Sequence, residues 1–330
     1  MKKIVSIIVL INMILAASAT AFAESSLIKT DEKLNAIFET ELPSGFKLQD
    51  LKNSVEKTPV FTDGQLNIGS DVRYALDSST LYDMSAYSSY EIVYESALPA
   101  TTNYTYFIFG KYDSIATGND PLAGQSIGRS YTVAISPGNS SNFAKYKFYK
   151  KVNVTTDTEL SKKLSTDSVK YTLKVDLTKT ENNISFYMDD ELLFMDSDET
   201  PVTLGYVALK TNYAKANVKS IKLIGYKDYG IKYEINGAGA TQMGAGQISA
   251  KLPKAVISGK TPVVFALYKA DGTLANAKVV KDDELVSDAI DLFNSDSDQN
   301  TLRAFIWDSL DSMKPQITDM GNGLIPGGGE

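Results

Sequence analysis

The chain has 330 residues, a formal net charge of −7, no histidine and no cysteine. Without cysteine it has no disulfide, no thiolate metal site and no lipid-anchored N-terminal cysteine, and without histidine it has no serine or cysteine triad of the usual kind. An acidic chain has no reason to bind nucleic acid or anionic lipid. The length exceeds that of most single domains and predicts two.

The first residues predict the compartment. A basic start precedes an apolar run over residues 4–17, and Ala21-Phe22-Ala23 follows it. This pattern is typical of a secretory signal peptide over residues 1–23, cleaved before Glu24. The run is shorter than the roughly 20 apolar residues of a transmembrane helix. We therefore expect a secreted protein, extracellular or loosely associated with the cell wall, with no membrane insertion.

Strand-length segments fill the next stretch, which we expect to form one domain over residues 24–227. Residues 36–42 have a strand-like pattern, and residues 59–68 predict a hairpin around Asp63-Gly64. The loop between Lys111 and Gly128 is longer than a hairpin turn, and such loops are often functional. Further strands bounded by Gly, Pro, Asn or Ser are expected over residues 90–96, 104–110, 131–135 and 146–149.

Residues 171–226 show the clearest period of two. Tyr171, Leu173 and Val175 alternate with polar residues, and Asp189-Asp190 supplies a tight turn. Such alternation predicts an antiparallel sheet with one buried face. With the earlier segments this gives about a dozen strands, which favours a large two-sheet sandwich.

Several of these segments also occur in a familiar order: the hairpin over 61–66, the strand over 171–175, and the segments 184–193, 204–209 and 218–223. The series resembles the concanavalin A-like lectin and glucanase superfamily, which includes laminin G-like jelly rolls. The resemblance covers about residues 36–226. It implies an all-β, jelly-roll β-sandwich, and it leaves the activity open.

The composition changes near residue 228, where glycine and alanine rise. A new series of strands follows, with a hairpin signal at Asp271-Gly272. The string over residues 302–315 and the Ala266-Leu267-Tyr268 segment resemble the C-terminal immunoglobulin- or fibronectin-like module of surface and secreted proteins of Gram-positive bacteria. The resemblance implies a smaller β-sandwich over 228–317 without chemistry of its own. The tail over 318–330 is expected to be flexible.

Only carboxylates, tyrosines and lysines remain for catalysis. The Glu-x-Asp-x-x-Glu strand of jelly-roll glucanases is not found, and the acidic cluster over residues 196–199 is expected to be a solvated turn. The loop over 294–300 fails as an EF-hand, because Gln299 replaces the turn glycine and Phe305 replaces the bidentate glutamate. We therefore assign no catalytic residue and no cofactor, and a structural calcium ion stays open without assigned ligands.

Carbohydrate binding has a positive signal in the tyrosines. Sugar rings stack their C–H faces on aromatic rings, and their hydroxyls need polar partners at the rim. Tyr104, Tyr106 and Tyr112 share a parity, and Arg129 and Tyr131 are expected to face them from the next strand. These five residues are the candidate ligand contacts. The alternative is that the rings pack the sandwich core.

We favour a secreted, non-catalytic polysaccharide-binding protein of the bacterial cell surface or extracellular space, whose partner is a polysaccharide or cell-wall glycan. A glycoside hydrolase or polysaccharide lyase using carboxylate or tyrosine chemistry is the first alternative. A structural or adhesive envelope protein is the second. The only tryptophan, Trp307, is expected to pack in the second domain.

Overall fold

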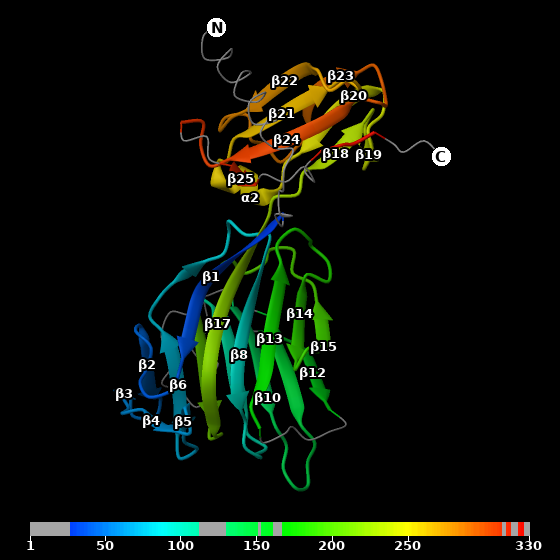
Figure 1. The fold of residues 1–330 in the computed structure, drawn as a ribbon. Helices are drawn as coiled ribbons and strands as arrows, with labels where there is room; N and C mark the ends of the chain where they lie inside the picture. The colour runs from blue at the N-terminus through cyan, green and yellow to red at the C-terminus, as the bar shows by residue number, and fades with distance from the viewer. Residues whose placement is uncertain are drawn as a thin grey trace. The chain divides into compact units, whose positions relative to one another are not determined.

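The computed structural model describes residues 27–111, 130–150, 153–160, 167–311, 315–317 and 323–326. Its one helix in these ranges is α2 (Lys254–Gly259), and nearly all other regular structure is β (Figure 1). No helix in the described ranges is long and apolar enough to cross a membrane. The chain divides into two compact units, the first over Thr30–Tyr226 and the second formed by the residues on either side of it.

Two antiparallel sheets build the first unit. We call sheet A the sheet whose strands lie in the order β15 (Glu191–Asp196), β14 (Ile184–Met188), β13 (Val169–Asp176), β8 (Ser89–Ala97), β17 (Ala216–Asp228), β5 (Gln65–Ile68) and β4 (Val60–Thr62), with β1 (Ile28–Ile37) also paired to β17.

We call sheet B the sheet whose strands lie in the order β12 (Asn153–Glu159), β11 (Lys145–Lys150), β10 (Ser130–Ser136), β9 (Thr105–Gly110), β16 (Leu204–Asn212), β6 (Arg73–Ser78), β2 (Phe46–Asp50) and β3 (Val55–Glu56), with β7 (Tyr82–Asp83) also paired to β16.

The core of this unit lies between the two sheets. Alternate residues of β8 pack against β9. The ring centroids of Tyr90 and Phe109 lie 5.2 Å apart, and those of Tyr94 and Phe107 lie 4.8 Å apart. The Tyr94 hydroxyl donates to the Ile108 carbonyl oxygen at 2.9 Å, so this buried polar group is satisfied. The all-β, jelly-roll β-sandwich predicted from the sequence is confirmed.

The predicted tight turns are also present. Asp63 and Gly64 have φ values of 53° and 69° between β4 and β5, and Asp189 and Asp190 have 48° and 65° between β14 and β15. Two consecutive residues with positive φ give the turn twist that fits a two-residue hairpin. Aspartate and glycine accept this backbone region more readily than branched residues do.

The first strand differs from the expectation. The sequence pattern placed it over residues 36–42, but β1 spans Ile28–Ile37 and most of its residues are exposed. An exposed strand has no alternation of apolar and polar residues to reveal it. Its place is set instead by backbone pairing with β17, which no local pattern encodes.

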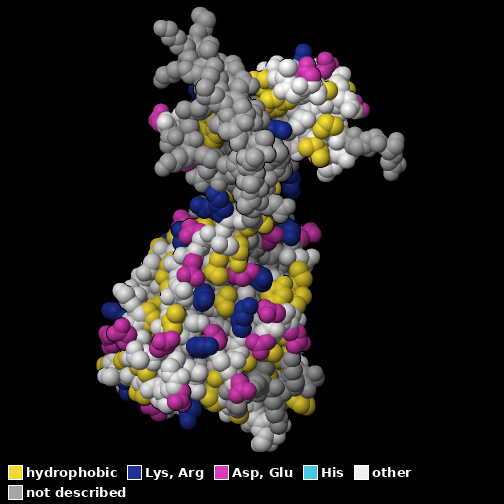
Figure 2. Space-filling model, in the orientation of Figure 1, with side chains coloured by type: hydrophobic (Ala, Val, Ile, Leu, Met, Phe, Trp, Pro, Cys, Tyr) yellow, Lys and Arg dark blue, Asp and Glu magenta, His cyan; other side chains and the backbone are white. Residues whose placement is uncertain are grey.

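The outer face of sheet A carries charges of both signs. Lys174 forms an ion pair with Glu91 at 2.7 Å, and Lys219 forms one with Glu95 at 2.6 Å. Figure 2 shows basic and acidic side chains interspersed over the face of this unit that is turned to the viewer. Such exposed pairs keep a sheet face soluble and contribute little to folding.

The second unit has two four-stranded antiparallel sheets. Phe265 and Ile306 belong to its core, to which α2 contributes Ala255 and Val256. Trp307 is buried in a smaller cluster with Val264, as expected from its place in the sequence. The strand orders are β19 (Ala238–Ala240), β18 (Lys232–Ile235), β20 (Gly246–Lys251), β23 (Ile290–Ser295), and β22 (Leu274–Val280), β21 (Val263–Tyr268), β24 (Thr301–Trp307), β25 (Pro315–Ile317).

Candidate functional site

The outer face of sheet B, turned away from the sandwich core, gathers several tyrosines. Three of them, Tyr104, Tyr106 and Tyr149, form a small cluster with Ile108, Ala134 and Ala208, separate from the core between the sheets. Alternation along β9, β11 and β16 places each ring on this side, because their neighbours in sequence point into the core. We call it the tyrosine face, and its tyrosines are Tyr104, Tyr106, Tyr149 and Tyr206.

The strand register arranges this face in rows. Ala208, Ile108 and Thr132 are neighbours across β16, β9 and β10, and Tyr149 of β11 ends their row. The next row holds Lys210, Tyr106, Ala134 and Lys147. The residues on the two central strands of these rows, Ile108, Tyr106, Thr132 and Ala134, are all buried.

Tyr104 has an aromatic ring and a lysine–aspartate ion pair beside it on this face. Its ring centroid lies 6.2 Å from that of Tyr106, with the planes tilted by 46°. The Lys147 ammonium lies 5.7 Å from the Tyr104 ring centroid and forms an ion pair with Asp157 at 2.8 Å. The hydrogen bond with Asp157 raises the pKa of Lys147. An aromatic ring with a cation and a carboxylate at its rim suits a sugar.

Buried polar groups lie beside these rings. The hydroxyls of Ser130 and Thr132 are buried and have no hydrogen-bond partner in the part of the chain that the structure describes. An unsatisfied buried hydroxyl costs about 1–3 kcal/mol. Lys210 is only 1% exposed, and burial lowers the pKa of its ammonium, while the Asp77 carboxylate opposes this change.

Two of the predicted contacts lie together on the tyrosine face. Tyr104 is half-buried, and Tyr106 is buried beside it. Tyr112 and Arg129 lie outside the described residues, so the structure does not test them.

Tyr131 differs from the expectation that it faces Tyr104 and Tyr106. It pairs with Phe109 in the sheet register, so its side chain points into the core, where it is fully buried. Its hydroxyl donates to Asp198 Oδ2 at 2.9 Å and accepts from the Val202 N–H at 3.1 Å. Tyr131 therefore holds a loop in place and offers no surface to a ligand.

Sequence reasoning missed two members of the face. Tyr149 shares its strand with Tyr146 and Phe148, which point the opposite way into the core, and Tyr206 has the parity of Ala208. Parity within each strand was a usable signal for both. It did not identify them, because the sequence does not show that β11 and β16 flank β10 and β9.

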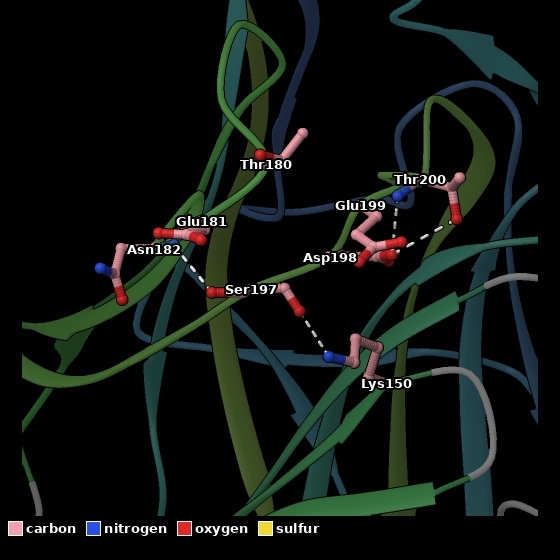
Figure 3. A pocket seen from close by; sticks show the side chains of 8 residues that line it. All are labelled: Lys150, Thr180, Glu181, Asn182, Ser197, Asp198, Glu199 and Thr200. Atoms are coloured by element: carbon pink, nitrogen blue, oxygen red, sulfur yellow. Dashed lines mark hydrogen bonds between the residues drawn. The ribbon is translucent and has the colours of Figure 1, made fainter.

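A separate cavity of about 680 Å³ lies among the loops at one end of the sandwich (Figure 3). Lys150 Nζ donates to the Ser197 carbonyl oxygen at 2.5 Å, and the Asn182 N–H donates to Ser197 Oγ at 2.8 Å. These bonds tie together the loop after β13, the loop after β15 and the end of β11. The lining residues are Lys150, Thr180, Glu181, Asn182, Ser197, Asp198, Glu199 and Thr200.

Asp198 shows that this loop cavity is mainly structural. The residue is buried, in contrast to the solvated turn expected for residues 196–199. Its Oδ1 accepts from the Thr200 N–H at 3.0 Å, and Asn183 bonds both its N–H and its carbonyl oxygen at 2.8 Å. No group of three or more acidic residues within the described ranges is placed to hold a metal ion. We therefore take the tyrosine face as the candidate site.

Comparison with known proteins gives structural matches alone. No protein-family model and no curated protein sequence matches the chain. A protein of unknown function with a galectin-like fold from Bacillus subtilis is 9% identical, covering 61% of this chain and 99% of that chain, with a TM-score of 0.46. The Emp47p carbohydrate recognition domain is 9% identical, covering 62% and 99%, with a TM-score of 0.45. A Bacillus licheniformis β-glucanase is 11% identical, covering 58% and 96%, with a TM-score of 0.39.

Proposed function

We propose that the protein is a secreted, non-catalytic polysaccharide-binding protein of the bacterial cell surface or extracellular space, and that the tyrosine face holds the glycan. The observation that supports this proposal is the gathering of tyrosines on one face of sheet B, with an ion pair beside Tyr104. Sugar rings stack on such aromatic surfaces, and their hydroxyls bond to charged groups at the rim. The apolar segment at the N-terminus supports export.

The ligand contacts proposed on this face come from the start of β9 and from β11 and β12 of sheet B. Tyr104 and Tyr149 supply half-buried rings, and Lys147 with its partner Asp157 supplies polar atoms. Tyr112 and Arg129 remain proposed contacts on the sequence argument.

For the second unit we propose an immunoglobulin- or fibronectin-like module. Its two four-stranded antiparallel sheets around a core of their own support this assignment. Modules of this architecture serve as spacers as well as binders, so the module carries no part of the glycan proposal.

The test uses mature protein beginning at Glu24 and a panel of plant and bacterial polysaccharides. Retention on a polysaccharide is measured by affinity electrophoresis, and release of reducing or unsaturated ends is measured in the same samples. The expected result is retention without product. Absence of retention on every polysaccharide would support a structural role instead.

Two tyrosine variants locate the binding surface. Tyr104→Ala should weaken retention about tenfold, which corresponds to about 1.4 kcal/mol. Tyr187→Ala is the matched control, because Tyr187 is also half-buried beneath a lysine ammonium, with Lys174 at 5.2 Å, but lies on the outer face of sheet A. Equal losses in both variants would refute the assignment to the tyrosine face.

Lyase activity is a second candidate, favoured by Lys210. This lysine is buried beside Tyr106 on the tyrosine face, and burial lowers the pKa of its ammonium. Lyase catalysis would need this amine in its deprotonated form, to take a proton next to the carboxylate of a uronate residue, after which the C4–O bond breaks and the leaving oxygen gains a proton. Unsaturated product from the wild-type protein, lost in Lys210→Met, would establish this candidate; no product from any acidic polysaccharide would remove it.

A further inference from the structure

A second cavity, of about 640 Å³, lies at the edge of the first unit. Leu48 of β2 and Tyr74 of β6 line it from sheet B, and Val60 of β4 and Ile68 of β5 line it from sheet A. We call this cavity the edge pocket. It lies away from the tyrosine face, whose tyrosines belong to or adjoin β9, β11 and β16. Cavities of this size are in the range that binds small molecules.

The floor of the edge pocket is apolar and firmly held. Leu48, Ile68 and Tyr74 are all buried members of the sandwich core. The Tyr74 hydroxyl donates to Asp71 Oδ1 at 2.8 Å, which fixes the ring. Burial and the bond to Asp71 raise the pKa of Tyr74 to about 12, so the hydroxyl keeps its proton at neutral pH. The floor therefore presents a rigid apolar surface, with the Asp71 carboxylate at its edge beside the Tyr74 hydroxyl.

The rim of the edge pocket carries positive charge. Lys57 and Lys215 line it, and none of its described lining residues is an aspartate or glutamate. Lys215 is exposed and has no ion-pair partner within the described ranges. Lys57 reaches Asp50 only at 3.9 Å. The Asp50 carboxylate already accepts from both N–H groups of the next turn, at Lys52 and Asn53.

Two amides complete the rim. Asn67 of β5 and Asn217 of β17 are paired in the sheet register and both line the edge pocket. An amide both donates and accepts, which matches the hydroxyls of a sugar ring. The edge pocket thus combines an apolar floor, paired amides and two ammonium groups. This set fits a ligand that has an apolar face, hydroxyls and a negative charge better than it fits an inorganic anion, which has no apolar face.

We propose that the edge pocket binds a carboxylate-bearing sugar, the uronic acid unit of an acidic glycan. The C–H face of the sugar packs on Ile68 and Tyr74, its hydroxyls bond to Asn67 and Asn217, and its carboxylate lies near Lys215. This proposal goes beyond the polysaccharide site on the tyrosine face and does not depend on it, since the two sites share no residue.

The experiment titrates isotope-labelled mature protein with D-glucuronate and, separately, with D-glucose and sulfate, and follows backbone amide shifts by NMR. Glucuronate should give saturable shifts at Ile68 and Asn217, and glucose should bind at least tenfold more weakly. Binding should weaken with added salt, because the lysines lie at the surface. Equal binding of glucose, or shifts confined to other residues, would overturn the proposal. Sulfate that displaces glucuronate at similar concentrations would reduce the site to a general anion site and overturn it as well.

Charge reversal provides the matched test. Lys215→Glu should weaken glucuronate binding at least tenfold, and Lys215→Arg should retain most of it. Lys222→Glu is the control. Lys222 lies in β17, which begins directly after Lys215, but it does not line the edge pocket. Unchanged binding in Lys215→Glu would overturn the proposal. Retention of neutral polysaccharide should not change in this variant, so failure here is distinguishable from failure of the tyrosine-face proposal.

Discussion

Replacement of Tyr131 by phenylalanine tests whether this tyrosine acts as a structural bridge. The substitution keeps the buried ring and removes the hydroxyl that joins Asp198 Oδ2 to the Val202 N–H. Both partners are buried residues, Asp198 at 5% and Val202 at 1% exposure. A buried group left without its partner costs about 1–3 kcal/mol, and more when the group is charged. We therefore expect the first unit to lose about 2–4 kcal/mol of unfolding free energy.

Tyr171 supplies the matched control. Its ring is also fully buried in the same core, but its hydroxyl has no hydrogen-bond partner in the described part of the chain. Tyr171→Phe removes a polar atom that is already unsatisfied, so stability should stay the same or rise by about 1 kcal/mol. The two variants make the same chemical change at equal burial, and only Tyr131→Phe should lower stability.

Urea and thermal unfolding measure this difference. Near-ultraviolet circular dichroism reports the many tyrosines of the first unit, while fluorescence of Trp307, the one tryptophan, reports the second. For a unit of this size each kcal/mol shifts the melting temperature by about 2–4 °C, so Tyr131→Phe should lower it by about 4–16 °C. Equal melting temperatures for Tyr131→Phe and Tyr171→Phe would refute the bridging role.

Three further predictions test the packing and the charges of the chain. Gly205→Ala would place a Cβ 2.4 Å from Gly110 Cα, so it should cost about 1–3 kcal/mol or more, while Gly239→Ala, with nothing within 4 Å, should stay within about 0.5 kcal/mol in urea unfolding. Burial raises the pKa of Asp50, but hydrogen bonds from Asn53 and Lys52 outweigh burial and hold this pKa below 3.8. The ionised Asp50 therefore stabilises the fold above pH 3.8, and this stabilisation is lost as the pH falls through the lowered pKa. In acid unfolding, Asp50→Asn should lose less unfolding free energy on acidification than the wild-type protein does. Burial lowers the pKa of Lys210, so the unfolded chain binds this proton more tightly and stability should rise with pH from the lowered value up to 10.5; Lys210→Met should abolish that rise in an alkaline stability profile.

The candidate site was only partly accessible from the sequence. Parity along one strand placed Tyr104 and Tyr106 on the same side, and the structure agrees. The same reasoning failed for Tyr131, because the side to which a neighbouring strand turns a given residue depends on its register, and a shift of one residue reverses every side chain. Tyr149 and Tyr206 join the face only because β11 and β16 take their places in sheet B.

The sequence by itself determined the local features of this protein. Alternating apolar residues determine the strands with one buried face, such as β13, and the Asp63-Gly64 and Asp189-Asp190 pairs determine two tight turns, because backbone preferences and side-chain alternation act within a few residues. The absence of histidine and cysteine also limits the chemistry before any folding occurs.

Only the tertiary structure decided which local features meet. The bond from Tyr131 to Asp198 joins residues 67 positions apart, and the edge pocket collects Leu48, Ile68 and Lys215 from both sheets. Hydrogen bonds between strands and the filling of a shared core select these pairings, and both depend on the whole chain. The tyrosine face and the edge pocket therefore arise from strand order and register, which no single stretch of sequence contains.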